Sequence, residues 1–445
     1  MKGNNYTTIV LILLLLLVFP FRVYGITVEE EKKYGREMYF QIARAVPINN
    51  DLYISFYLHS MQERLEAATS LELPIVFTVI DSPTVDAFAS IGGYVFITTG
   101  LISLCDKEEE LAGVMAHEFA HISKRHVAKA IEKQKFMTWT TLATMLAAAL
   151  IPSPAGKSAV LSAGLGGAQQ MAITYTRENE EEADEVGSAN ADKAGYGGLG
   201  TAEFLKKLRI TSDNKMVPRY LLTHPHHGER IVKIGNRWRN STVKLDTSFF
   251  PYVTARAQIL YRTPGLGIEE IWMNKYLRDN TDPVNCYAAA LIYSMRGDTD
   301  ESVRVASGIK SPYRDIFLGE MLVNARRYKE ATDLLRYESN PIGCYFLAKA
   351  YEGGGDRPMA VKAYKEILSY ANIYPELYSR LGMLCGMMGN EGDGYRFLGS
   401  YHLVLGNVDQ ARTNFEKAVN RYGINSKGGQ EVVNLLDRLP SKNKK

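Results

Sequence analysis

Residues 110–121 read ELAGVMAHEFAH and contain the pattern His-Glu-x-x-His at positions 117–121. Residues four positions apart lie on the same face of an α-helix, so the imidazoles of His117 and His121 can reach one metal ion. Glu118 lies between them and can take a proton from an attacking water molecule. The pattern therefore predicts a zinc-binding helix, with Glu118 as the catalytic base of a metallopeptidase.

The helix that carries this pattern follows a β-rich part of the chain. Residues 74–80 (PIVFTVI) and 93–99 (GYVFITT) have the composition of strands and are separated by turn-forming residues. No Gly-Pro breaker interrupts the helical pattern that follows Asp106, so we expect the helix to run to about Val127. The sequence thus predicts an α+β zincin-like metalloprotease domain that is mainly helical and contains a small sheet.

A catalytic zinc site needs a third protein ligand and leaves a further position for water. The acidic segment 177–185 reads as the start of a later helix, and Glu180 is the candidate ligand in it. Asp184 lies one turn further along the same helix face. A zinc-bound histidine commonly donates its second ring N–H to a carboxylate, and Asp184 is the candidate acceptor. We expect one zinc ion per chain.

These residues resemble the gluzincin metallopeptidases of the HtpX and CAAX-protease type. The resemblance includes the residues 117–121, Glu180 and Asp184 within ENEEEAD, DAFA at 86–89 and GGYVFI at 92–97. It implies a zinc metalloendopeptidase in which Glu118 acts as the base. It also implies that a peptide substrate binds as an added β-strand, mainly through its backbone.

Two further site features follow from the same resemblance. His224, in Thr223-His224-Pro225, would lie beside the zinc as a regulatory fourth ligand or as a donor to the transition state. By contrast, His126 lies five residues after His121, about 140° around a continuous helix, and should point away from the metal. Asp86 departs from the family's usual Asn. The edge strand that holds the substrate would contain Gly93, Tyr94, Val95 and Phe96.

The first 25 residues have the pattern of a secretory signal. Lys2 gives the positive start, Ile9–Phe19 is an apolar run, and a cleavage site ends at Gly25. The run has 11 residues, fewer than the roughly 20 that span a bilayer. A periplasmic protein is expected, and an uncleaved membrane anchor is the alternative.

Charge and cysteine content restrict the classes of partner. Removing residues 1–25 would leave 50 basic and 49 acidic residues, so no nucleic-acid-binding face is expected. Export permits a disulfide among Cys286, Cys344 and Cys385, with buried free thiols as the alternative. Within residues 136–173, an uncharged run is broken by prolines and is too short to span a membrane. It reads either as a buried helix or as a hairpin in peripheral contact with lipid.

After about residue 283 the sequence reads as helical pairs with an internal repeat. Small residues recur in phase, as in Gly319 and Ala331, a pattern typical of tetratricopeptide repeats, whose helices cross closely. We expect an all-α tetratricopeptide-repeat array. The predicted domains are a signal peptide at 1–25, a zinc metalloprotease domain at 26–265 and a repeat domain at 283–440.

These features together predict a zinc-dependent endopeptidase of the cell envelope. By resemblance to periplasmic family members with such repeats, it would degrade misassembled outer-membrane proteins and assist their assembly. Its substrates would be unfolded or stalled envelope proteins, and its repeats would bind the outer-membrane assembly machinery. Two alternatives are a repeat-based chaperone or scaffold whose proteolysis is latent, and an HtpX-like membrane-anchored protease.

Overall fold

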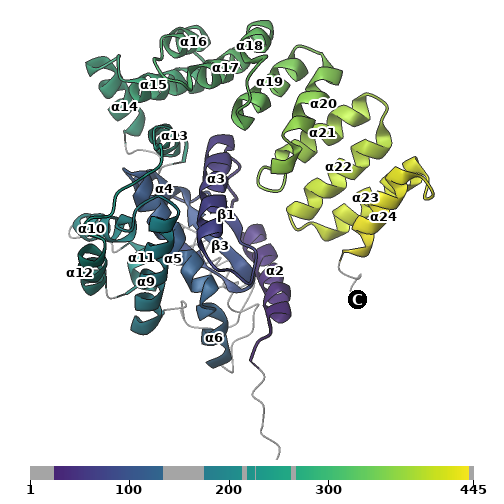
Figure 1. Ribbon diagram of the computed structural model, residues 1–445. Coiled ribbons are helices and arrows are strands. Elements are labelled where there is room, and N and C mark those ends of the chain that lie inside the picture. Colours follow the sequence, from purple (N-terminus) through teal and green to yellow (C-terminus); the bar gives the residue numbers. More distant parts are fainter. Residues whose placement is uncertain (1–24, 134–174, 213–217, 226, 262–266, 440–445) are drawn as a thin grey trace, which may run out of the picture.

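The computed structural model is mainly helical, with one small sheet in the N-terminal half (Figure 1). No helix in the described part of the chain is long and apolar enough to span a membrane. The predicted signal sequence, apart from Gly25, and the uncharged segment 136–173 lie outside the described residues. Those residues are 25–133, 175–212, 218–225, 227–261 and 267–439.

The N-terminal half packs its helices around the sheet and the helix that carries the His-Glu-x-x-His pattern. Its elements are α2 (Val28–Ala45), α3 (Leu52–Ala68), β1 (Val76–Ile80), β2 (Ala87–Ala89), the 3-10 helix η1 (Ile91–Gly93), β3 (Tyr94–Thr98), α4 (Thr99–Leu104), α5 (Glu108–Ser123), α6 (His126–Lys133), α9 (Arg177–Lys193), α10 (Gly200–Ser212), α11 (Arg219–Thr223), α12 (His227–Arg237) and α13 (Phe250–Tyr261).

The three strands lie in the order β1-β3-β2, with β1 parallel and β2 antiparallel to β3. Strand β3 is therefore central, and its backbone pairs on both sides. The prediction that residues 93–96 form a substrate-binding edge strand is wrong for this reason: Tyr94, Val95 and Phe96 belong to β3, and Gly93 ends η1. The edge next to α5 is β2, since β2 contacts α5 and β1 lies on the other side.

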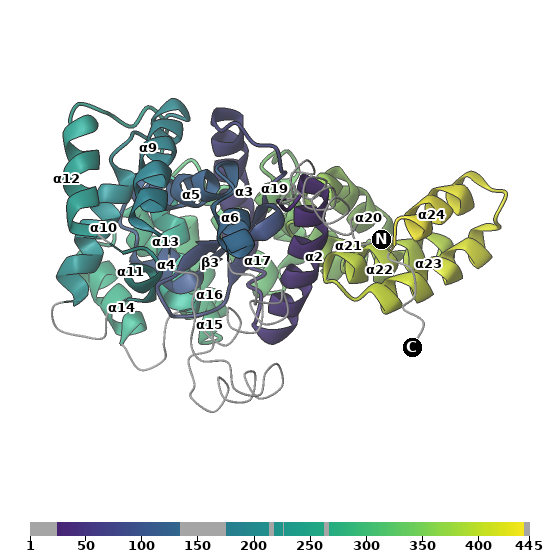
Figure 2. The same ribbon diagram turned by 90° about the horizontal axis from the view of Figure 1, so that it is seen from below.

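Two glycines allow the helices of the site to pack closely. Helices α5 and α9 lie side by side (Figures 1 and 2). A Cβ atom on Gly187 of α9 would lie only 2.9 Å from the backbone of His117 in α5. A Cβ atom on Gly113 would lie 2.3 Å from the backbone nitrogen of Thr201 in α10. These contacts leave no room for a larger side chain, so Gly187 brings Glu180 within reach of the histidines.

Helix α5 is shorter than the sequence pattern indicates. It ends at Ser123, and Arg125 adopts a left-handed conformation with φ of 56° before α6 begins at His126. That conformation is unfavourable for a residue with a Cβ atom. The Arg125 side chain compensates by donating to Glu31 (2.5 Å) and to the carbonyl oxygen of Ile26 (2.5 Å). The predicted continuation of the helix to Val127 is therefore wrong.

The C-terminal half is entirely helical within the described residues and forms an arc from α14 to α24 (Figure 1). The prediction of a helical C-terminal region is confirmed. Its elements are α14 (Ile268–Arg278), α15 (Pro283–Met295), α16 (Thr299–Ser307), α17 (Arg314–Asn324), α18 (Tyr328–Leu335), α19 (Pro341–Gly353), α20 (Arg357–Glu366), η2 (Leu368–Tyr370), α21 (Glu376–Met387), α22 (Glu391–Val404), α23 (Val408–Tyr422) and α24 (Lys427–Asp437).

Small residues bring consecutive helices of the arc together, as their recurrence in the sequence predicts. A Cβ atom on Gly319 would lie 2.6 Å from the side chain of Leu335, across the pair α17–α18. A Cβ atom on Gly399 would lie 2.4 Å from the ring of Phe415, across α22–α23. The cysteines of the arc are buried free thiols, so no disulfide joins Cys286, Cys344 and Cys385.

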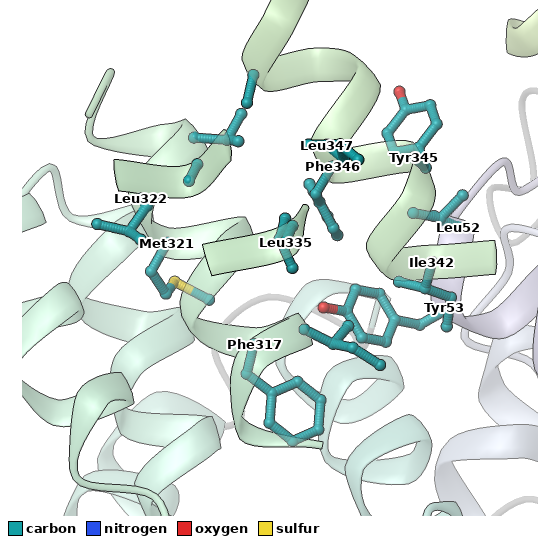
Figure 3. Packing of buried hydrophobic residues seen from close by; sticks show 14 of the residues in the cluster. Leu52, Tyr53, Phe317, Met321, Leu322, Leu335, Ile342, Tyr345, Phe346 and Leu347 are labelled. Carbon is teal, nitrogen blue, oxygen red and sulfur yellow. The ribbon is translucent and has the colours of Figure 1, made fainter. Parts of the chain in front are cut away.

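Helix α3 connects the two halves because both of its faces are buried. One face, with Ile54 and Leu58, belongs to the core of the N-terminal half. The other face, with Leu52 and Tyr53, belongs to the core of the arc. Figure 3 shows these two side chains among residues of the arc, including Phe317, Ile342 and Phe346. The two halves thus share a continuous hydrophobic junction.

Candidate active site

Four side chains from three parts of the chain converge on one point. His117 and His121 come from adjacent turns of α5, Glu180 from the first turn of α9, and His224 from the C-terminal end of α11. One ligand atom from each lies within 4.8 Å of all the others. All four side chains are fully buried. The structure therefore brings together the three ligands predicted from the sequence and the additional histidine.

The spacing of these atoms fits a tetrahedral zinc ion. Four ligands at about 2.0–2.1 Å from zinc in a tetrahedron lie about 3.3 Å from one another. His117 Nε2 lies 3.0 Å from His121 Nε2 and 3.3 Å from His224 Nδ1. Glu180 Oε1 lies 3.0 Å from His224 Nδ1 and 3.5 Å from His121 Nε2. Three imidazole nitrogens and one carboxylate oxygen are also donors that zinc favours.

Asp184 contacts His117 on the side away from this point. Its Oδ1 lies 3.1 Å from His117 Nδ1, which leaves His117 Nε2 directed at the other ligands. Arg230 of α12 holds Asp184 through two hydrogen bonds, Nε to Oδ2 (2.6 Å) and Nη2 to Oδ1 (2.8 Å), and also pairs with Glu180. Burial opposes ionisation, but Arg230 and His117 outweigh it and hold the pKa of Asp184 below its ordinary value.

Arg230 is the site residue that sequence reasoning missed. It is buried on the same face of α12 as Ile231 and Ile234. A charged residue within the apolar stripe of an amphipathic helix was the available signal, because a buried arginine requires acidic partners. Those partners are Asp184 and Glu180, which lie one turn apart on α9.

Glu118 lies beside the four converging atoms. Its Oε2 accepts a hydrogen bond from the backbone N–H of Ala89 in β2 (2.8 Å), and its Oε1 lies 3.4 Å from His224 Nε2. The carbonyl of Ala89 accepts from the Tyr175 hydroxyl (3.4 Å). Both backbone groups of Ala89 therefore point away from β3, the N–H towards α5 and the carbonyl towards Tyr175. The side chain of Glu118 is fully buried, as are its neighbours in the site.

His224 is fixed by the segment that precedes it. Its ring stacks on Tyr220, with ring centres 4.4 Å apart, and its backbone N–H donates to the Tyr220 carbonyl (2.9 Å). Arg219 pairs with Asp86 at the entry to β2 (2.7 Å). Burial raises the pKa of Asp86 to about 6, although Arg219 favours its charged form. The departure from Asn at position 86 thus gives α11 an ionic contact with the sheet.

The two histidines of α5 have opposite protonation tendencies. Burial lowers the pKa of His121 well below its ordinary value, which favours the neutral imidazole that a metal requires. Burial also acts to lower the pKa of His117, but its contacts with Asp184 and Glu180 outweigh that effect and raise it to about 9. In the zinc-free protein, His117 therefore carries a proton at neutral pH.

Zinc affinity should consequently rise with pH between 7 and 9. A zinc ion bound by His117 would displace its proton, so the apparent affinity should fall as the pH falls below the pKa of about 9. The change expected for one displaced proton is about tenfold per pH unit. Competition with a chelator of known protonation behaviour measures it. An apparent affinity that stays constant from pH 7 to pH 9 would show that His117 is neutral before zinc binds.

Comparison with known proteins agrees with this geometry. Residues 55–237 match the model of peptidase family M48. The chain carries a peptidase family M48 domain. The matched region contains the four converging residues and Glu118, and the family is one of zinc-dependent metallopeptidases. The predicted resemblance to gluzincin metallopeptidases and the prediction of one zinc site are confirmed at the level of the M48 domain.

Three relatives illustrate how far the similarity extends. The β-barrel assembly-enhancing protease of Escherichia coli K12 is 29% identical over 352 residues, which cover 74% of this chain and 71% of the relative. A Vibrio cholerae protein provisionally given the same name is 32% identical over 280 residues, 60% of this chain and 57% of its own length. The mitochondrial metalloendopeptidase OMA1 of Schizosaccharomyces pombe is 28% identical over 235 residues, 51% of this chain and 66% of its own.

Proposed function

We propose that the chain is a zinc-dependent endopeptidase of the cell envelope that acts on misassembled outer-membrane proteins. The observation that carries the proposal is the buried cluster of His117, His121, Glu180 and His224, with Glu118 beside it, in an M48 domain. His117, His121 and Glu180 are the proposed zinc ligands, and Asp184 orients His117. When bound there, zinc would polarise the scissile carbonyl and the attacking water.

Glu118 is the proposed general base. Its Oε2 accepts from Ala89, which fixes the carboxylate next to the ligand cluster. The other oxygen, Oε1, faces the side of the site where His224 lies. Glu118 can take the proton of the attacking water there and pass it to the leaving amine.

Strand β2 is the proposed binding site for the substrate backbone. It is the edge of the sheet next to α5, and the backbone groups of Ala89 point away from β3. By the alternation of a β-strand, the backbone groups of Ala87 point the same way. An extended peptide that replaces Glu118 and Tyr175 as partners of the Ala89 backbone can pair with this edge through its main chain, so recognition would depend little on side chains. This assigns the edge-strand role to β2 in place of the central strand β3.

The arc of helices α14–α24 is proposed to be a tetratricopeptide-repeat array that binds outer-membrane assembly proteins. The close helix crossings at Gly319 and Gly399 support the repeat assignment. The name of the Escherichia coli relative supports the link to β-barrel assembly. The proposal includes export to the periplasm and the domain division at 26–265 and 283–440. Because Leu52 and Tyr53 share a core with the arc, docking should be tested with the chain intact.

His224 is proposed to hold the enzyme in a latent state. With its Nδ1 in the fourth ligand position, it excludes water from that position. Its Nε2 then lies 3.4 Å from Glu118 Oε1, so the ring stands next to the proposed base. The complete burial of both side chains agrees with a closed site. This arrangement favours a protease whose activity is latent until α11 moves.

Replacing His224 with Ala should therefore raise proteolysis. If the closed form holds more than ~90% of the molecules, removing it should increase the rate on the order of tenfold. Cleavage of casein and of the chain itself measures the effect, with zinc content determined on the same sample. His59→Ala, a histidine of α3 outside the site, is the matched control.

The competing role for His224 predicts a change of the opposite sign. A donor to the transition state typically contributes on the order of 100-fold or more in rate. Lower activity of H224A with zinc retained would show that His224 is a transition-state donor and does not hold the enzyme latent. An unchanged rate would show that His224 has neither role.

A further inference from the structure

The turn between α5 and α6 places His126 against the proposed zinc ligand His121. The helix breaks at Arg125, which has a positive φ, and His126 Nδ1 then lies 2.9 Å from His121 Nδ1. His126 is 1% exposed, so this is a buried contact. As expected, His126 is not one of the four converging residues. Its ring nevertheless lies against His121, on the side of that ring opposite the ligand cluster.

A second contact continues from His126 to the surface. Its Nε2 lies 3.0 Å from Glu182 Oε2, and Lys124 Nζ lies 2.9 Å from the other carboxylate oxygen. The side chain of Glu182 is 43% exposed. Tyr175 stacks on the face of the His121 ring, with ring centres 3.8 Å apart. His121 is thus held between Tyr175, His126 and the other ligands.

Once His121 Nε2 binds a metal, only one placement of the ring hydrogens allows hydrogen bonds from His121 to His126 and from His126 to Glu182. The lone pair of Nε2 is then used, so the hydrogen of His121 must lie on Nδ1. His121 Nδ1–H donates to His126 Nδ1, which must therefore be the acceptor nitrogen. The hydrogen of His126 then lies on Nε2 and is donated to the Glu182 carboxylate. Each donor in this series has one acceptor.

We propose that His126 and Glu182 are positioning residues for the zinc site. The series His121–His126–Glu182 fixes the tautomer and the ring plane of His121, as Asp184 does directly for His117. The two histidine ligands are therefore supported differently. His117 is supported by a buried carboxylate held by Arg230, whereas His121 is connected through His126 to a carboxylate at the surface. This inference rests on the proposed zinc-binding role of His121.

The first test measures zinc affinity in the variant H126F, which retains a ring but loses both hydrogen bonds. Loss of such a supporting partner typically weakens metal binding by about 10–100-fold. The variant should show this loss in chelator competition, and the visible spectrum of its cobalt-substituted form should shift. H126Q, which keeps an acceptor and a donor, should recover part of the affinity. An H126F affinity within about twofold of the parent, with an unchanged cobalt spectrum, would overturn the proposal.

The second test changes Glu182, the partly exposed residue of the series, and leaves the buried histidines unchanged. E182A should weaken zinc binding several-fold, whereas the matched control E181A should not, because Glu181 pairs with Arg177 and Lys233 instead. In the H126F background, E182A should have no additional effect, since the connection is already broken. Equal effects of E182A and E181A, or full additivity with H126F, would overturn the proposal even if H126F folds poorly. Failure of the parent to bind zinc would instead refute the proposed function.

Discussion

Replacing Glu118 with Gln is expected to abolish proteolysis and to leave zinc bound. The Glu118 carboxylate is not one of the four converging ligand atoms, and the amide oxygen of Gln can still accept from the Ala89 N–H. The amide cannot take the proton of the attacking water. Loss of a general base typically costs about 10²–10⁴-fold in rate. Zinc content by mass spectrometry and cleavage of casein measure the two outcomes separately.

The matched control is the same chemical change at a ligand. Glu180→Gln should lose both zinc and activity, because a neutral amide is a poorer zinc ligand than a carboxylate and Glu180 belongs to the cluster. His117→Ala and His121→Ala should also lose zinc. Because the parent is proposed to be latent, E118Q should be compared in both the parental and the H224A background. An E118Q chain that cleaves at the rate of its own background would show that Glu118 is not the base.

The second large effect is expected at the junction of the two halves. Arg256 of α13 donates from Nε to Asp51 (2.6 Å) and from Nη1 to Glu320 of α17 (2.9 Å). Its guanidinium also lies 4.4 Å from the ring centre of Tyr53. Asp51 and Glu320 are buried, so Arg256→Met leaves two carboxylates without their counter-ion. Breaking such a buried network typically costs about 3–5 kcal/mol of the free energy of unfolding.

Urea unfolding followed by fluorescence measures this loss. The control is Arg296→Met, which breaks the exposed pair Arg296–Glu269 and should cost about 1 kcal/mol or less. Removing the carboxylate charges as well, in the triple variant R256M/D51N/E320Q, should recover much of the loss, because the cost arises from uncompensated buried charge. A loss for R256M no greater than that for the Arg296 variant would contradict the assigned role of Arg256.

The two histidines of the proposed metal site could be predicted because their relation depends on local spacing. His117 and His121 share a helix face by their separation alone, and that relation does not depend on the rest of the fold. Glu180 could be predicted only in combination with the His-Glu-x-x-His helix that precedes it, since an acidic segment by itself usually marks a solvated helix face. Its burial depends on Gly187, whose missing side chain lets α9 approach α5. The sequence shows the glycine but not the helix that it contacts.

The errors arose where tertiary contacts decide the outcome. The segment 93–99 has the composition of a strand, but composition does not reveal which neighbours pair with it, and the true edge β2 has only three residues. The helix break at Arg125 involves neither glycine nor proline. It is maintained by contacts with Glu31 and Ile26, nearly a hundred residues earlier in the chain. The supporting role inferred for His126 follows from that break.

The most direct test of the zinc site is anomalous diffraction at the zinc absorption edge from crystals of the purified chain. The proposed function predicts one zinc peak per chain, at about 2.0–2.2 Å from His117 Nε2, His121 Nε2 and an oxygen of Glu180. A preparation that cleaves protein but shows no peak there, or shows its zinc bound elsewhere, would contradict the assignment of this cluster as the catalytic centre.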